Sequence, residues 1–253
     1  MSSFSTPDGT RIAWQTIGEG RPIVLLHGLF SSGQTNWIKY GAAAEIAASG
    51  RQVLLPDFRA HGASDKPHAP ELYPPDILAQ DIEAFVAHLG LRDYDLGGYS
   101  LGARTTVRLL ARTVIPTPSR VVLGGMGLSG ITDIKGRSDF FLSVIAQSGS
   151  HKPGTADHFA DAFMRQNNVD TIAVAHLLRS QLATPLDVVR TLQPPTLVIA
   201  GENDHDNGSA SELALALPHA AHAIIPGNHM SAVIKPDFGT AIAAWLAHQT
   251  PVA

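Results

Sequence analysis

The residues best suited to chemistry in this sequence are Gly98, Ser100 and Gly102, which form the pattern Gly-x-Ser-x-Gly. A short apolar run, 94–96, precedes the pattern and a helix-forming run, 103–112, follows it, as expected for a sharp turn between a strand and a helix. Glycines on both sides of the serine let the strand and the helix pass close together, because glycine has no Cβ. The helix behind the serine points free N–H groups toward any negative charge that forms there. The pattern predicts a nucleophilic serine, Ser100, presented on a strained turn.

A nucleophilic serine needs a base, an acid that orients the base, and donors for an oxyanion. Candidates for the acid and the base follow two later apolar runs, 196–200 and 221–225: Asp204 comes after the first and His229 after the second. The carboxyl ends of parallel strands meet at the same edge of a sheet, so both side chains are expected beside Ser100. The chain order of nucleophile, acid and histidine is typical of serine hydrolases built on such a sheet.

Three other residues compete for the roles of acid and base. Glu202 and Asp206 flank Asp204, and either carboxylate has the chemistry to orient an imidazole. We favour Asp204 because it lies where the loop should turn toward the edge that carries the serine. His205 is expected to face solvent.

The oxyanion donors are expected from two backbone N–H groups, one in the residue after the nucleophile and one in the loop after an early strand. Leu101 follows the serine, and the loop is supplied by His27-Gly28-Leu29-Phe30. Gly28 lets the backbone bend so that the N–H of Leu29 faces the serine, with Phe30 as the alternative donor. His27 stands directly at the strand end, where a histidine is better placed to hold its own loop than to act as a base.

Apolar runs separated by helical patterns make up most of the remaining sequence. An opening hairpin is expected over 4–16, with its turn at Pro7-Asp8-Gly9. Strands are expected at 22–26, 52–55, 94–96, 121–123, 196–200 and 221–225, and helices at 37–49, 75–89, 103–111, 209–217 and 238–248. Runs that are apolar on both faces predict an α/β fold, in which helices cover both sides of a parallel sheet.

The region between the runs at 121 and 196 has helical periodicity and no strand pattern over about 70 residues. Helices are expected there at 138–147, 155–166 and 170–181. We interpret residues 129–190 as a helical cap inserted into a core domain formed by residues 1–128 and 191–253.

Apolar side chains of this cap are expected either to line a pocket or to pack the cap onto the core: Phe140, Phe141, Phe159, Phe163, Met164 and Leu182. The cap contains no cluster of arginine or lysine that would require a strongly anionic substrate. Substrate contacts are therefore expected from Phe30, Tyr99, Met126, Phe140, Phe141 and Phe163.

Composition excludes several classes of function. The 253 residues carry a formal net charge of −4, so the composition gives no indication of nucleic-acid binding. The chain has no cysteine, which excludes disulfides, thiolate metal sites and a cysteine nucleophile. None of the 12 histidines forms a pair with metal-ligand spacing.

The first residues, 1–11, lack the features of a secretion signal, and no apolar run approaches the length that spans a membrane. We therefore expect a soluble, cytoplasmic protein that acts on a small molecule and has no metal site, no nucleic-acid partner and no membrane partner.

Several motifs taken together resemble the α/β-hydrolase fold superfamily: Leu25-Leu26-His27-Gly28, Pro56-Asp57-x-Arg59-x-His61-Gly62-x-Ser64, the turn around Ser100, Gly201-x-x-Asp204, and His229. The resemblance covers residues 4–126 and 192–246. It implies an eight-stranded, mostly parallel sheet with an antiparallel second strand, a lid over the active site, and no cofactor. It also implies that the stretch from Asp57 to Gly62 shapes a loop beside the pocket.

The same superfamily includes haloalkane dehalogenases and epoxide hydrolases, which use an aspartate where this chain has Ser100. A serine at that position favours acyl transfer to water, and esters, thioesters, lactones and C–C bonds next to a ketone all fit that chemistry. A carboxylic ester of modest size is the leading hypothesis. A lyase or a cofactor-free perhydrolase using the same three residues, and a ligand receptor with slow turnover, stay open as alternatives.

Overall fold

One sheet of eight strands organises the computed structural model, which describes residues 1–247. The strands are β1 (Ser2–Ser5), β2 (Arg11–Ile17), β3 (Arg21–Leu26), β4 (Arg51–Pro56), β5 (Asp95–Tyr99), β6 (Val121–Gly124), β7 (Thr196–Gly201) and β8 (Ala220–Ile225). Their order across the sheet is β1-β2-β4-β3-β5-β6-β7-β8. β2 runs antiparallel to both of its neighbours, and all pairs from β4 to β8 are parallel. The expected mostly parallel sheet with an antiparallel second strand is confirmed.

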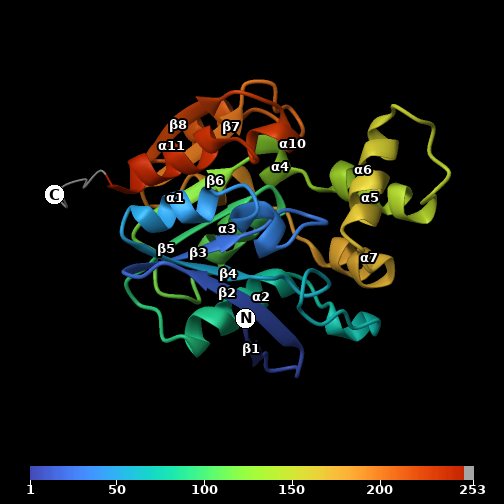
Figure 1. The fold of residues 1–253 in the computed structure, drawn as a ribbon, viewed down its shortest axis with the longest axis horizontal. Helices are drawn as coiled ribbons and strands as arrows, with labels where there is room; N and C mark the ends of the chain where they lie inside the picture. The colour runs from blue at the N-terminus through green and yellow to red at the C-terminus, as the bar shows by residue number, and fades with distance from the viewer. Residues whose placement is uncertain (248–253) are drawn as a thin grey trace.

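Helices pack on both faces of this sheet (Figure 1). They are α1 (Ala42–Ala48), α2 (Ile77–His88), α3 (Leu101–Arg112), α4 (Leu128–Thr132), α5 (Lys135–Ala146), α6 (Ala156–Gln166), α7 (Thr171–Ser180), α8 (Leu186–Val189), α9 (Ala210–Ala216), α10 (His229–Ala232) and α11 (Pro236–Ala247), with a π-helical turn at Gln34–Ile38 and a 3₁₀ turn at Pro70–Leu72. The expected helix at 238–248 corresponds to α11, and His248 lies outside the described residues.

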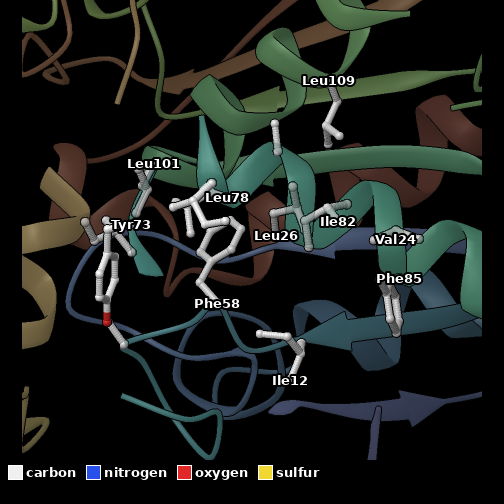
Figure 2. Close-up of a cluster of buried hydrophobic side chains, with 14 of the residues drawn as sticks. Ile12, Val24, Leu26, Phe58, Tyr73, Leu78, Ile82, Phe85, Leu101 and Leu109 are labelled. Atoms are coloured by element: carbon white, nitrogen blue, oxygen red, sulfur yellow. The ribbon is translucent and has the colours of Figure 1, made fainter. Parts of the chain in front are cut away.

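The alternation of side chains along β3 explains which helices cover which face. Val24 and Leu26 point into a core shared with α2 and α3, and Figure 2 shows them beside Ile82 and Leu109 of those helices. Leu25 points to the opposite face, into a core shared with α1 and α11. α9 packs beside α3 on the first face. Because both faces of the sheet are buried, the central strands are apolar throughout, as the sequence pattern indicated.

The predicted single helix at 37–49 is wrong. Residues Gln34–Ile38 form a π-helical turn, and α1 begins only at Ala42. Gly41 separates the two segments with a φ of 88°, a left-handed conformation that ends a helix and that glycine adopts without steric cost. Helical periodicity continues through this glycine, so the pattern alone did not reveal the break.

Between β6 and β7 the chain forms only helices, α4 to α8. Figure 1 shows α5, α6 and α7 (yellow to orange) standing to one side of the sheet. Thr155 and Asp170 cap α6 and α7 through their side chains, which explains where these helices begin. Phe159, expected either to line a pocket or to pack the cap onto the core, is instead exposed. The division into core domain and cap stays a prediction.

No helix within residues 1–247 is both long enough and apolar enough to cross a membrane.

Candidate active site

The turn between β5 and α3 holds Ser100 in a rare backbone conformation, with φ 53° and ψ −112°. A Cβ at Gly98 would lie 2.3 Å from the carbonyl carbon of Gly102, and a Cβ at Gly102 would lie 2.2 Å from the carbonyl oxygen of Leu26. Neither position tolerates a side chain, since no real Cβ approaches backbone so closely. The N–H of Ser100 donates a 2.8 Å hydrogen bond to the carbonyl of Gly124, which fixes the turn against β6. The serine is therefore held in a strained conformation by its surroundings.

Three side chains expected to act together are brought together by the fold. Nε2 of His229 lies 3.0 Å from Oγ of Ser100. Nδ1 of His229 lies 2.9 Å from Oδ2 and 3.1 Å from Oδ1 of Asp204. His229 and Asp204 are both buried, with 7% and 8% of their surface exposed, so the pair is shielded from water. In this arrangement the serine hydroxyl can give its proton to the imidazole, which the carboxylate orients.

His229 is positioned by its place at the start of a helix and by contacts with Tyr99. It begins helix α10, whose N-terminus is closed by a capping box between Asn228 and Ser231. The hydroxyl of Tyr99 donates a hydrogen bond to the carbonyl of His229, and the Tyr99 ring packs 5.2 Å from the imidazole. These contacts place a histidine that follows β8 beside a serine that follows β5.

The competing acids lie elsewhere. Asp206 forms an ion pair with Arg137 at 3.0 Å, and Glu202 is exposed. His205 is exposed, as expected. Of the three carboxylates considered from the sequence, Asp204 is the one that meets the imidazole of His229.

Two backbone N–H groups are free to act as oxyanion donors. The N–H of Phe30 donates to Nε2 of His61 at 3.2 Å and is thereby occupied. No hydrogen bond in the described part of the chain uses the N–H of Leu29 or that of Leu101. Both residues line a small cavity that also contains Ser100. This geometry favours Leu29 over Phe30 as the donor from the early loop.

Two buried histidines hold this loop in place. His27 donates from Nδ1 to the carbonyl of Gly28 at 2.8 Å and accepts from the N–H of Phe58 at 3.0 Å. His61 donates from Nδ1 to the carbonyl of Arg59 at 3.1 Å and accepts from Phe30. Burial lowers the pKa of His27 to about 4 and that of His61 to about 3, the latter also because His27 is its neighbour. His27 is thus a neutral residue that fixes the loop, as expected from its position at the strand end.

These histidines make folding stability depend on pH. In the unfolded chain a histidine takes up a proton near pH 6.5, whereas the folded pKa values are about 4 and about 3. The neutral folded forms stabilise the protein above pH 6.5, and this stability is lost as the pH falls from 6.5 toward the folded pKa values. At pH 5 we expect a loss of about 2 kcal/mol per histidine.

The measurement is urea unfolding at a series of pH values for wild type, His27→Gln and His222→Gln. The slope of unfolding free energy between pH 6.5 and 5 should be roughly halved in His27→Gln. His222 is exposed, so its variant should keep the wild-type slope. An unchanged slope in His27→Gln contradicts the assignment.

The segment from Asp57 to Gly62 supports the same region. Oδ1 and Oδ2 of Asp57 accept from the N–H groups of Gly33 and Ala63, both at 2.8 Å. Arg59 is fully buried and paired with Asp81 through two 2.6 Å hydrogen bonds. The segment therefore fixes the loop beside the site, in agreement with its expected structural role.

The cavity beside Ser100 is less apolar than expected. Its lining consists of Leu29, Ser100, Leu101, Arg104, Arg137, Ser138, Phe141, Leu178, Gln181 and Asn207. Of the predicted substrate-binding residues only Phe141 is among them. The others pack away from it: Phe30, Tyr99 and Met126 are buried in the core, and Phe140 and Phe163 lie against neighbouring apolar side chains.

The polar members of this lining were missed from the sequence. Arg104 lies four residues after Ser100, one helical turn along α3, and this spacing was the available signal. Arg137 and Gln181 come from the helical region, and nothing in the sequence indicated that they would meet Arg104. The expectation concerned arginines clustered within the cap; two arginines nevertheless line the cavity, because one comes from α3 in the core and the other from α5.

Comparison with known proteins agrees with the fold. Residues 21–125 match a family model described as alpha/beta hydrolase fold. A non-heme haloperoxidase of Rhodococcus erythropolis is 27% identical over 94% of this chain and 96% of the relative. N-formylmaleamate deformylase of Pseudomonas putida is 30% identical over 75% of this chain and 64% of that enzyme.

Among solved structures, an esterase from Exiguobacterium antarcticum superposes with a TM-score of 0.79 at 18% identity, covering 98% of this chain and 99% of that one. A bromoperoxidase from Bacillus anthracis superposes with a TM-score of 0.75 at 20% identity, covering 98% of this chain and 100% of that one. Identities this low concern the fold alone. The sequence match over residues 21–125 and the shared architecture agree: the chain has the α/β-hydrolase fold.

Proposed function

We propose that this protein is a serine hydrolase that cleaves a small to medium carboxylic ester through an acyl-enzyme on Ser100. The observation that carries the proposal is the hydrogen-bonded row from Ser100 through His229 to Asp204. A thioester or a lactone would react by the same steps.

In the proposed mechanism, Oγ of Ser100 attacks the ester carbonyl while Nε2 of His229 accepts the hydroxyl proton. The oxyanion of the tetrahedral intermediate accepts hydrogen bonds from the N–H groups of Leu29 and Leu101. The imidazolium then gives its proton to the leaving alcohol, and an acyl-enzyme remains. Water, deprotonated by the same histidine, releases the acid. Asp204 holds the imidazole in the tautomer with its proton on Nδ1 and stabilises the imidazolium.

We propose further that residues 129–190 act as a cap over this site. Helix α5 contributes Arg137, Ser138 and Phe141 to the cavity that contains Ser100, and α7 contributes Leu178. A substrate bound beside the serine would therefore contact both the core and the cap, and the cap would exclude water from the reacting atoms.

A second candidate is perhydrolysis, in which hydrogen peroxide replaces water in the release step and the product is a peracid. The relative named as a non-heme haloperoxidase, which aligns over 94% of this chain, favours this candidate, because a peracid can oxidise a halide. A relative named 2-hydroxy-6-oxo-2,4-heptadienoate hydrolase, 24% identical over 74% of this chain, keeps cleavage of a C–C bond next to a ketone open as well.

The test combines turnover with active-site labelling. Purified protein is assayed on short 4-nitrophenyl esters, thioesters and lactones, with and without hydrogen peroxide, and is labelled with a fluorophosphonate probe. We expect ester turnover of about 1 per second or faster and a single adduct, on Ser100. An adduct on another serine contradicts the assignment of the nucleophile. Binding with far slower turnover favours the receptor alternative.

A further inference from the structure

Two guanidinium groups face the cavity that contains Ser100. Arg104 extends from α3, one turn beyond the serine, and Arg137 extends from α5. The proposed reaction needs neither group, because attack, proton transfer and oxyanion binding are assigned to other residues. The presence of two arginines at this cavity therefore needs a separate explanation.

Arg104 differs from Arg59, which is also buried, and from Arg108, which is partly buried. Arg59 pairs with Asp81, and Arg108 pairs with Asp76. Arg104 is 7% exposed, yet its hydrogen bonds go to neutral acceptors: Nε donates to the carbonyl of Gly130 at 2.8 Å, and Nη1 donates to Oε1 of Gln181 at 2.6 Å. No ion pair within residues 1–247 includes it. A buried charge without a counter-ion destabilises the fold, so a bound anion beside Arg104 would be stabilising.

The electrostatics of Arg104 and Arg137 also favour a bound anion. Burial and the nearby charge of Arg137 lower the pKa of Arg104 to about 10, so the guanidinium stays protonated at neutral pH despite both effects. Asp206 balances Arg137 only from the solvent side, since that carboxylate is 45% exposed. An anion in the cavity would relieve the repulsion between the two cations.

Unpaired polar atoms in the same lining give an independent indication. Oγ of Ser138 and Nε2 of Gln181 are buried and have no hydrogen-bond partner, and both residues line the cavity. Each can donate a hydrogen bond, and a buried donor without an acceptor is energetically unfavourable. The guanidinium of Arg137 is held in place by the ring of Phe141, 4.8 Å away. Two cations and two unpaired donors thus converge on one small volume.

A purely structural role accounts for part of this arrangement. The bond from Arg104 to the carbonyl of Gly130 ties α3 to α4. It does not account for the second arginine, for the unpaired donors of Ser138 and Gln181, or for their position in the cavity that contains the serine. A ligand with oxygen acceptors and negative charge accounts for all of them.

We infer that Arg104 and Arg137 bind a carboxylate of the substrate, so that the ester cleaved is a half-ester of a dicarboxylic acid. The free carboxylate accepts hydrogen bonds from the two guanidinium groups, with Ser138 and Gln181 as further donors, and the ester carbonyl lies at Ser100. This inference rests on the proposed hydrolase function and narrows its substrate class.

The experiment compares two esters with the same leaving group. One is the 4-nitrophenyl half-ester of glutaric acid, which is an anion, and the other is its methyl ester, which is neutral. Spontaneous release of 4-nitrophenol is measured without protein and subtracted. We expect wild-type kcat/KM to be at least about tenfold higher for the anionic ester than for the neutral one. One charge-assisted hydrogen bond is enough to give a difference of this size.

Arg104→Gln should lower the ratio of the two kcat/KM values by about 10- to 100-fold, and Arg137→Gln should lower it less because Asp206 already pairs with that arginine. Arg179→Gln removes the same charge from an exposed position on α7 and should leave both rates unchanged. Should Arg104→Gln not fold, Arg137→Gln carries the same test, since it leaves the hydrogen bonds of Arg104 intact. Equal wild-type rates on the two esters, or an unchanged ratio in a folded arginine variant, overturn the inference.

A binding measurement separates failure of this inference from failure of the hydrolase function. Glutarate is titrated into Ser100→Ala protein by calorimetry, which requires no turnover. Binding that is lost when Arg104→Gln is added supports the carboxylate site even if no ester is hydrolysed. Absence of binding, together with absence of any preference for the anionic ester, overturns the site while leaving the hydrolase function in place.

Discussion

Ser100→Ala should lower kcat for the best ester by about a million-fold, as loss of the nucleophile does in another hydrolase of this mechanistic type. The side chain is 3.0 Å from the imidazole that would activate it, and the chain has no cysteine to substitute as nucleophile. The fold should survive, because alanine is smaller than serine and Oγ contributes only the bond to His229. The measurement is steady-state kinetics with wild-type and variant protein at equal thermal stability.

The matched control is Ser211→Ala, which removes an exposed hydroxyl far along the chain and should keep wild-type kinetics. Residual activity of Ser100→Ala above a hundredth of wild type, in protein free of wild-type contamination, would mean that another group attacks the ester.

Asp204→Asn should lower kcat by about ten-thousand-fold, by analogy with the same change in another triad. The carboxylate contacts Nδ1 of His229 through both oxygens, so it can accept only if Nδ1 carries the proton. An asparagine amide presents an N–H to the same ring nitrogen and so favours the opposite tautomer, in which Nε2 cannot accept the proton of Ser100. The protein should fold, because asparagine has nearly the same shape as aspartate.

Glu202→Gln is the control for this change. Glu202 is exposed and lies two residues before Asp204, so the substitution removes a nearby negative charge that does not contact the imidazole. It should leave kcat within a few-fold of wild type. If Asp206→Asn produced the large loss and Asp204→Asn did not, a carboxylate other than the one nearest the imidazole would be the orienting acid.

The sequence was most informative where a local steric rule fixes the structure. Gly98 and Gly102 predicted the turn at Ser100 because only glycine fits where strand and helix cross. Asp204 and His229 could be placed because parallel strands deliver their carboxyl ends to one edge. Gly41 was misread, since a glycine inside a periodic pattern is compatible with either a continuous or an interrupted helix.

The cavity lining was the least predictable part of the structure. Its composition depends on how α5 and α7 dock beside α3, and no local pattern encodes that arrangement. The residues predicted to contact substrate proved largely to be packing residues, as for Phe30 and Met126. The spacing between Ser100 and Arg104 was the one usable sign of a polar cavity.

The separation of the reacting residues along the chain has a consequence during biosynthesis. Ser100 and His229 are 129 residues apart, and the histidine follows the last strand of the sheet. At ordinary rates of translation the ribosome needs roughly ten seconds to make the intervening residues. On the proposed mechanism a nascent chain carries its nucleophile long before it carries its base. The growing polypeptide would then be chemically silent toward esters until His229 has been made and positioned, so no separate inhibitor is required to keep a shorter nascent copy inactive.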